Sequence, residues 1–379
     1  MVSNTRLGRI AALALGTVAL VSARAPGRDI DAAVARAMAT TGARGVAVAL
    51  IENGRVVSTR SYGARNARGD PPTTDTVMYG ASLTKAVFGY LVVQLAAEKK
   101  LDLDQPIASM LPRPLPEYGN LDAYGHWGDL AGDARWQRIT PRHALNHATG
   151  FANFAELEPD GKLRFHFDPG TRYAYSGEGI SLLQFGIEQG LGLSIEAELQ
   201  RRFFRPLGMT RTSLIWQDGF APNLADGWDE NGRPEPHDDR SRVRAAGSMD
   251  TTINDLAAIA AAMVRGYGLS KHWHAEYGRG TQAITSRTQF PTLNNEAAPS
   301  ERTDAKAALG VIAFSGPQGR GWLKGGHNDV TANTLVCLER GRRCVLILGN
   351  DVRIEKAFPT LVRAALGDTG VPYDWEYGR

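Results

Sequence analysis

The 379-residue chain has only two cysteines, Cys337 and Cys344, too few to form a zinc site on their own. Its 43 basic and 40 acidic residues are interleaved, and no basic segment is combined with aromatic residues. The sequence therefore lacks the charge pattern of a nucleic-acid-binding surface. It also lacks a glycine-rich phosphate loop or another cofactor fingerprint. We expect no metal, no cofactor and no nucleic-acid partner.

Long apolar runs are scarce, and the main one lies near the N-terminus. Arg6 and Arg9 precede an apolar run over residues 10–21, and small residues follow it. About a dozen apolar residues fall short of the ~20 that a membrane-spanning helix needs. The pattern is typical of a cleaved secretory signal peptide over residues 1–23, and a retained membrane anchor is the alternative. We expect residues 24–379 to be exported, to the periplasm or beyond, without stable membrane insertion.

The two cysteines flank a predicted hairpin turn. Apolar runs lie on both sides of Arg340 and Gly341, and a two-residue turn there would place Cys337 and Cys344 directly opposite each other. Cross-strand Cβ atoms lie within ~5.5 Å, close to the reach of a disulfide. In an oxidising compartment we expect a bond between them. Two free core thiols are the alternative.

Strand patterns occur at both ends of the chain, and helical patterns in the middle. Asn53-Gly54 between two alternating runs predicts a hairpin. The expected strands are 45–51, 55–62, 307–314, 321–323, 334–338 and 344–348. The expected helices are 29–40, 81–98, 181–201, 252–265 and 359–366. Three polar, aromatic loops lie between them, at 113–138, 217–244 and 266–302.

This order predicts an α+β fold. Strands from both chain ends, residues 24–80 and 305–379, would pair into one antiparallel sheet flanked by helices. Residues 81–304 would form an all-helical lobe beside the sheet, within a single catalytic domain.

The segment that points most clearly to chemistry is Gly80-Ala-Ser82-Leu-Thr-Lys85, at the start of the expected helix 81–98. A serine hydroxyl needs a base to become a nucleophile. Residues three apart on a helix share a face, so Lys85 would lie beside Ser82. Desolvation and the positive end of the helix dipole would both lower the pKa of the lysine. The alternative is a helix-capping serine with a solvated lysine.

Together with five further segments, this motif resembles the serine penicillin-recognising enzymes, in the branch of class C β-lactamases, family VIII esterases and D-peptidases. The other segments follow in the family's order over most of the mature chain. They are Leu101-Asp-Leu-Asp104, residues 139–151 (similar to "T-x-x-x-L-L-x-H-T-S-G"), Asp168-Pro-Gly-Thr171 leading to Tyr175-Ser176, Pro206-Leu-Gly-Met209, and Ala246-Gly-Ser-Met-Asp-Thr251. The resemblance implies a β-lactamase/transpeptidase-like fold and an acyl-enzyme formed on an ester or amide substrate.

The resemblance also implies roles for individual residues. Ser82 would be the nucleophile, Lys85 its base, and Tyr175 a second acid/base group. Tyr173 is a rival for the last role. Because a phenol has a reference pKa of ~10, the tyrosine would need a nearby cation to gain phenolate character.

The family's third motif, K-T-G or H-x-G, is matched by Lys324-Gly325-Gly326-His327. Lys324 or His327 would supply a cation, and the glycines would let the substrate lie along the strand edge. A glycine-rich hairpin corner is the alternative. The oxyanion hole would use the backbone N–H of Ser82 and a second N–H from the strand after Lys324.

Two departures from the family pattern bear on the substrate. Gly177 stands where relatives carry an asparagine that contacts the substrate amide, and Gly325 replaces the threonine of K-T-G, which binds a carboxylate. Both favour an esterase or peptidase over a β-lactamase. The alternative from another class is a catalytically impaired penicillin-binding sensor or cell-wall scaffold. The oligomeric state stays open.

Other eye-catching residues have plainer interpretations. His143 and His147 are four apart, but no third metal ligand accompanies them, so a hydrogen-bonded core role is expected for His147. His237 and the segment 271–274 are expected in solvated loops. Four loop tryptophans are candidates to line an acyl pocket; they are Trp127, Trp136, Trp216 and Trp228.

Overall fold

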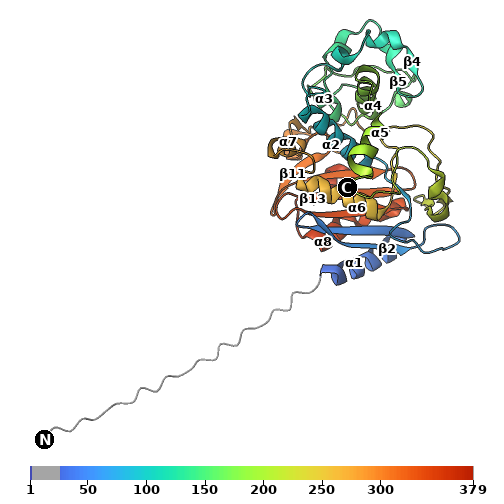
Figure 1. Ribbon diagram of the computed structural model, residues 1–379, viewed down its shortest axis with the longest axis vertical. Coiled ribbons are helices and arrows are strands. Elements are labelled where there is room, and N and C mark those ends of the chain that lie inside the picture. The colour runs from blue at the N-terminus through green and yellow to red at the C-terminus, as the bar shows by residue number, and fades with distance from the viewer. Residues whose placement is uncertain (2–25, 379) are drawn as a thin grey trace.

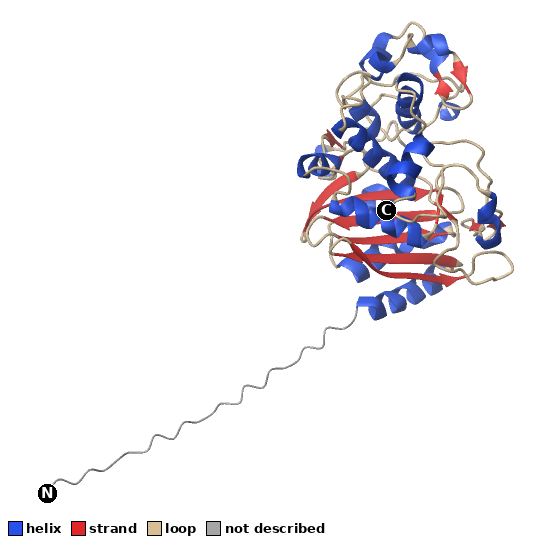
Figure 2. Ribbon diagram, in the orientation of Figure 1, coloured by secondary structure: helices blue, strands red, loops and turns tan. Residues whose placement is uncertain are grey.

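The computed structural model describes Met1 and residues 26–378, so nearly all of the expected signal peptide lies outside the described residues. Within the described part, no helix is long and apolar enough to cross a membrane. An eight-stranded sheet forms one half of the molecule, and short helices and loops gather beyond it (Figures 1 and 2). Each neighbouring pair of its strands is antiparallel, and the α+β prediction is confirmed.

Strands from both ends of the chain pair in this sheet, as expected. The N-terminal strand β1 (Gly45–Glu52) pairs with β2 (Arg55–Gly63) on one side and with the C-terminal β14 (Arg343–Gly349) on the other. Asn53 and Gly54 have φ values of 51° and 71° in the β1–β2 turn, which asparagine and glycine tolerate best. The sheet continues through β13 (Ala332–Leu338), β12 (Gly319–His327), β11 (Ile312–Gly316), β10 (Lys306–Ala307) and β9 (Gln282–Ala283).

Strands β1 and β14 are buried on both faces, which explains their nearly uninterrupted apolar sequences. In β1 the alanines Ala47 and Ala49 pack into the core that holds α2 (Leu83–Ala97) and α6 (Ile253–Arg265). The alternate valines face a second core, shared with α1 (Pro26–Thr41) and α8 (Phe358–Leu366). Successive side chains of a strand point to opposite faces, so Ala47 and Ala49 of β1 face the α6 side and Val46 and Val48 face the side of α1 and α8.

The remaining helices lie mostly beyond the sheet. They are α3 (Pro141–Leu145), α4 (Gly177–Phe185), α5 (Ile195–Leu199), α7 (Lys271–Tyr277) and α9 (Tyr373–Tyr377). Three two-stranded pairs complete the fold: β3 (Met78–Tyr79) with β8 (Asp250–Thr251), β4 (Asn120–Leu121) with β5 (Gly125–His126), and β6 (Gly227–Trp228) with β7 (Pro234–Glu235).

Several expected boundaries differ from the structure. Helix α6 and strand β9 fall within residues 81–304 but pack on or join the sheet, so this range is not purely helical. The expected helix 181–201 is two helices, because Gly192 takes a positive φ of 64° and Ser194 caps the second one. The expected strand 307–314 is interrupted at Gly310, whose φ is 87°.

The cysteine hairpin forms as predicted. Cys337 in β13 and Cys344 in β14 are directly paired across the ladder, and they form a disulfide. The turn closes through a hydrogen bond from Arg342 N–H to Glu339 C=O, with the two expected turn residues between them. Both cysteines are fully buried.

Candidate active site

Ser82 occupies the position just before helix α2. The preceding Ala81 has a φ of 47°, a conformation that costs a non-glycine residue ~1–2 kcal/mol and is often found at functional sites. Ser82 makes no side-chain capping hydrogen bond to the helix. The capping interpretation of this serine is therefore wrong, and its Oγ is engaged elsewhere.

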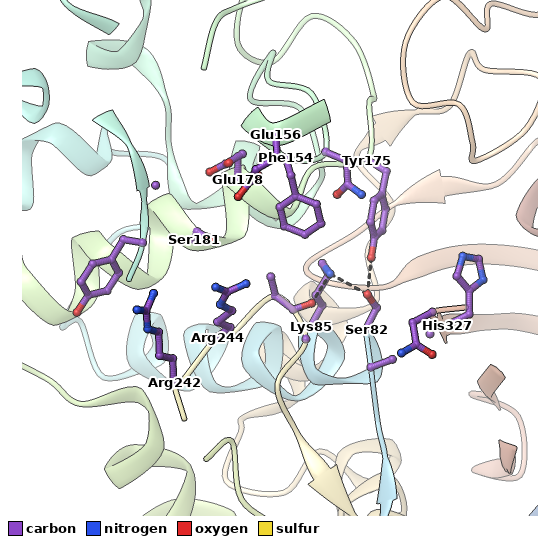
Figure 3. A pocket seen from close by; sticks show the side chains of 18 of the residues that line it. Ser82, Lys85, Phe154, Glu156, Tyr175, Glu178, Ser181, Arg242, Arg244 and His327 are labelled. Atoms are coloured by element: carbon purple, nitrogen blue, oxygen red, sulfur yellow. Dashed lines mark hydrogen bonds between the residues drawn. The ribbon is translucent and has the colours of Figure 1, made fainter. Parts of the chain in front are cut away.

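Two side chains meet at that oxygen (Figure 3). Lys85 Nζ and Tyr175 Oη each lie 2.8 Å from Ser82 Oγ in a hydrogen bond. Lys85 Nζ also donates to the backbone carbonyl of Ala246. Lys85 comes from the first turn of α2, Tyr175 from the segment before α4, and Ala246 from the loop before β8. Three distant parts of the chain thus meet around Ser82 and Lys85.

Burial favours the neutral form of Lys85. Its side chain is buried within α2, and burial lowers its pKa well below the usual value. The nearby charge of Lys324 lowers the pKa further. A neutral amine has a free lone pair, so Lys85 is able to accept the Ser82 proton.

Tyr175 is a protonated phenol between two amines. Burial raises its pKa, and the hydrogen bond with Ser82 only partly offsets that rise. Lys85 Nζ and Lys324 Nζ lie 4.9 and 5.1 Å from the centre of its ring. The two amines do not bring the pKa of the phenol down, so the expected phenolate character is absent and Tyr175 can serve as a proton donor or relay.

His147 orients this tyrosine. Its ring lies 4.3 Å from the Tyr175 ring at a tilt of 33°, and its Nδ1 is 3.2 Å from both the N and the O of Ser176. Burial lowers the pKa of His147 well below its usual value. The expected buried, hydrogen-bonded role is confirmed. His143 instead forms a capping box with Thr140 at the start of α3.

Tyr173, the rival of Tyr175, faces away from Ser82. It packs 5.7 Å from Trp375 by ring centroids, in the core beneath the sheet. Its hydroxyl is buried and has no hydrogen-bond partner among the residues that the structure describes. The spacing argument for Tyr175 therefore identified the tyrosine that contacts Ser82.

Strand β12 places the third motif beside Ser82. Lys324 is buried and donates a 2.8 Å hydrogen bond to the Gly325 carbonyl. At Gly326 a Cβ atom would lie 2.9 Å from Leu83 N and 3.0 Å from Ser82 N. The glycine is thus required because the strand runs directly against the start of α2. The sequence had suggested a different reason, namely space for the substrate along the strand edge.

Glu376, from the C-terminal helix α9, was missed by the sequence reasoning. It is 6% exposed and accepts a hydrogen bond from Gln289. Its Oε1 lies 2.2 Å from the point where a Cβ of Gly325 would stand, and the Gly325 N–H bonds to its carboxyl group. Burial raises the pKa of Glu376, while Lys324 and His327 lower it. A carboxyl group therefore fills the space beside Gly325.

A cavity of about 600 Å³ opens over Ser82. Its lining includes Phe154, Phe290 and His327, whose Nδ1 lies 3.0 Å from Glu355 Oε2. That contact raises the pKa of His327. The four loop tryptophans are not among the lining residues, so the expectation that they form an acyl pocket is wrong; Trp127, for example, is fully buried in the core.

Two further loop expectations fail. His237 is not solvated, because its side chain is 4% exposed and its Nε2 lies 3.0 Å from Asp250 Oδ1. Residues 271–274 belong to α7 instead of a loop. The Ser270 side chain caps that helix by accepting from Trp273 N–H, a signal already present in the sequence.

Comparison with known proteins decides the family. The model of the family described as Beta-lactamase matches residues 30–365. The chain belongs to the Beta-lactamase family. Two solved structures share the fold of this family member. The octameric penicillin-binding protein homologue from Pyrococcus abyssi has a TM-score of 0.68 at 20% identity, covering 89% of this chain and 76% of its own. The Beta-Lactamase/D-Alanine Carboxypeptidase from Pseudomonas syringae has a TM-score of 0.71 at 16% identity, covering 90% and 99%.

Curated relatives of this Beta-lactamase family chain have diverse names. A probable fimbrial assembly protein FimD of Dichelobacter nodosus is 26% identical over 65% of this chain and 66% of its own. Monacolin J acid methylbutanoyltransferase of Aspergillus terreus is 28% identical over 42% of this chain and 44% of its own. The chain spans less than two thirds of the length of these relatives.

The departure of this Beta-lactamase family chain at Gly177 has a local cause. A Cβ there would lie 2.3 Å from Cε1 of Phe154. The Gly177 N–H donates to Asn153 Oδ1 at 2.9 Å, so the loop before α4 packs where a side chain at 177 would begin. Asn153 and Phe154 both line the cavity.

Proposed function

We propose that the protein is an exported serine hydrolase that cleaves carboxylic esters through an acyl-enzyme on Ser82. The observation that carries the proposal is that the amine of Lys85, whose neutral form burial favours, and the protonated Tyr175 both contact the Ser82 hydroxyl, which does not cap the helix. A nucleophile needs such a base within hydrogen-bond distance.

In the proposed acylation, the Ser82 proton moves to Lys85 as Oγ attacks the ester carbonyl. When the tetrahedral intermediate collapses, the carbon–oxygen bond to the alcohol breaks, and the alkoxide takes the proton from Lys85 through the Tyr175 hydroxyl. In deacylation a water molecule gives its proton to Lys85 and attacks the acyl carbon. The acid leaves, and Ser82 Oγ regains its proton. No redox step or co-reactant other than water is involved.

The oxyanion would be held by two backbone N–H groups. One is that of Ser82, at the positive end of α2. For the second we propose the His327 N–H, with support from the strand geometry. The Gly325 N–H bonds to the Glu376 carboxyl group, and alternate residues of a strand direct their N–H groups to the same edge. The His327 N–H therefore points to that same edge, next to the cavity.

Glu376 favours an ester over a β-lactam or D-peptide substrate. The family resemblance places the recognition of a substrate carboxylate at residues 324–326. Here the Glu376 carboxyl group stands where the side chain of residue 325 would begin. A carboxylate next to the scissile bond would meet this acidic group instead of a threonine hydroxyl. The packing of Phe154 against Gly177 removes a second contact that relatives make with an amide.

Export is supported by the N-terminal pattern over residues 1–23 and by the disulfide between Cys337 and Cys344. Disulfides persist in oxidising compartments and are rare in the cytosol.

The test is steady-state hydrolysis of p-nitrophenyl butyrate, nitrocefin and a D-Ala-D-Ala peptide by the wild type and by Ser82→Ala. We expect sustained ester turnover, with much slower cleavage of the other two, and its loss in Ser82→Ala. The control is Ser181→Ala, which removes another serine that lines the same cavity. Ester hydrolysis that survives in Ser82→Ala contradicts the proposal.

The sensor or scaffold alternative predicts a different time course. A protein that only binds would release one equivalent of p-nitrophenol per chain and then stop. Linear release over many equivalents excludes that alternative.

A further inference from the structure

Two arginines share the cavity with Ser82 but have no place in the proposed chemistry. Arg242 and Arg244 both line it (Figure 3). Ala246, whose carbonyl accepts a hydrogen bond from Lys85, follows Arg244 by two residues. Two extended residues span at most about 7 Å, so Arg244 is anchored close to the catalytic groups.

Their direction is fixed by the buried side chain of Gln184. Its Nε2 donates to Val243 C=O at 3.0 Å, and its Oε1 accepts from Ala245 N–H at 2.8 Å. These two hydrogen bonds, called the Gln184 clamp below, replace the backbone hydrogen bonds that a neighbouring strand would make. Val243 packs against the core, and in an extended segment alternate side chains point to opposite sides. Arg242 and Arg244 are therefore both directed to the cavity.

The two guanidinium groups differ in their partners. Arg242 Nη1 donates to the Asp122 carbonyl at 2.9 Å and so ties down the β4–β5 hairpin. Within residues 26–378 the Arg244 guanidinium forms no side-chain hydrogen bond or ion pair, and its charge acts on Glu178 through space. An arginine fork suits a carboxylate because it can donate two parallel hydrogen bonds.

From this arrangement we propose that Arg244 binds a carboxylate at the far end of the substrate's acyl group. The substrate would then be the half-ester of a dicarboxylic acid, or an ester of similar acyl charge. This inference rests on the proposed function, and it concerns a different end of the cavity from Glu376.

The acidic residues of the cavity do not cancel this site. Glu178 faces the arginines in Figure 3, but it is 5% exposed and already accepts from Ala155 N–H at 2.9 Å. Burial raises its pKa to about 7, although the hydrogen bond from Ala155 and the charge of Arg244 partly offset that rise, so a large share is uncharged at neutral pH. Glu156 is exposed at the cavity wall. If these carboxyl groups decided specificity, the preferred acyl end would be an ammonium group.

The experiment compares three p-nitrophenyl esters of matched length, whose acyl chains end in a methyl, a carboxylate or an ammonium group. We expect kcat/KM to be highest for the carboxylate ester, and to fall by about tenfold or more in Arg244→Gln. For the ester whose acyl chain ends in a methyl group, kcat/KM should change less than about threefold. The matched control is Arg205→Gln, an exposed arginine outside this cavity. The proposal is overturned if the enzyme prefers the ester whose acyl chain ends in a methyl or an ammonium group. It is also overturned if Arg244→Gln and Arg205→Gln have equal effects.

Binding provides a readout that does not need turnover. In the Ser82→Ala background, the mono-anilide of glutaric acid should bind more tightly than butyranilide, and Arg244→Gln should abolish the difference. Equal binding of the two anilides overturns the Arg244 site even if the ester is cleaved. If the glutaric anilide binds more tightly but the wild type hydrolyses none of the esters, the Arg244 site is retained and only the proposed function is overturned.

Discussion

Replacing Gly326 with alanine tests how closely β12 must approach the nucleophile. The new Cβ would lie 2.9 Å from Leu83 N, 3.0 Å from Ser82 N and 3.2 Å from Gly80 O. All three are backbone atoms, which cannot rotate away. Non-bonded carbon contacts relax only at ~3.5 Å or more, so the strand and the helix start must separate by about 0.5 Å.

That displacement acts on catalysis more than on folding. Overpacking of this kind costs ~1–3 kcal/mol of stability. A shift of ~1 Å in a catalytic group can reduce the rate ~100-fold, so we expect kcat/KM to fall by at least about tenfold. The measurement is ester hydrolysis together with urea unfolding.

The control for this variant is Gly219→Ala. At Gly219 a Cβ would meet nothing within 4 Å, and the backbone has no positive φ. This variant should retain both activity and stability. Full activity in Gly326→Ala would refute the argument that β12 is positioned by contact with Ser82 N.

Three further predictions follow from the site and the sheet. The value of kcat/KM should rise with pH as Lys85 loses its proton. Lys324→Met should move this rise to higher pH, because Lys324 lowers the pKa of Lys85. A shift of the rise to lower pH would contradict this. Tyr175→Phe should lower kcat by about 100-fold or more, since it removes a proton relay, whereas Tyr173→Phe should leave kcat nearly unchanged; equal losses would contradict the assignment. Replacing both Cys337 and Cys344 with alanine should lower the free energy of unfolding by about 2.5 kcal/mol, from loop-closure entropy for a closed loop of ~8 residues; an unchanged urea midpoint would contradict it.

Local patterns gave the parts of the fold that depend on local chemistry. Asn53-Gly54 predicted the first hairpin, and the turn at Arg340 and Gly341 predicted the cysteine pairing. The spacing of Ser82 and Lys85 placed both side chains on one helical face. In each case the deciding residues are neighbours in sequence, so turn and helix geometry suffice.

Long-range packing supplied what the sequence could not. Glu376 lies next to the site only because α9 returns to the end of β12. Arg244 is directed to the cavity by the Gln184 clamp, a contact across 59 to 61 positions. The protonation of Tyr175 depends on burial by groups from several segments.

Whether Lys85 activates Ser82 is tested by mass-spectrometric mapping of the adduct formed with a fluorophosphonate probe. A single adduct is predicted on the peptide that contains Ser82, formed faster as pH rises along the same limb as ester hydrolysis, and absent in Ser82→Ala. An adduct on Ser181 instead, or labelling of Ser82 that does not respond to pH or to replacement of Lys85, would contradict the claim that a neutral lysine activates this serine.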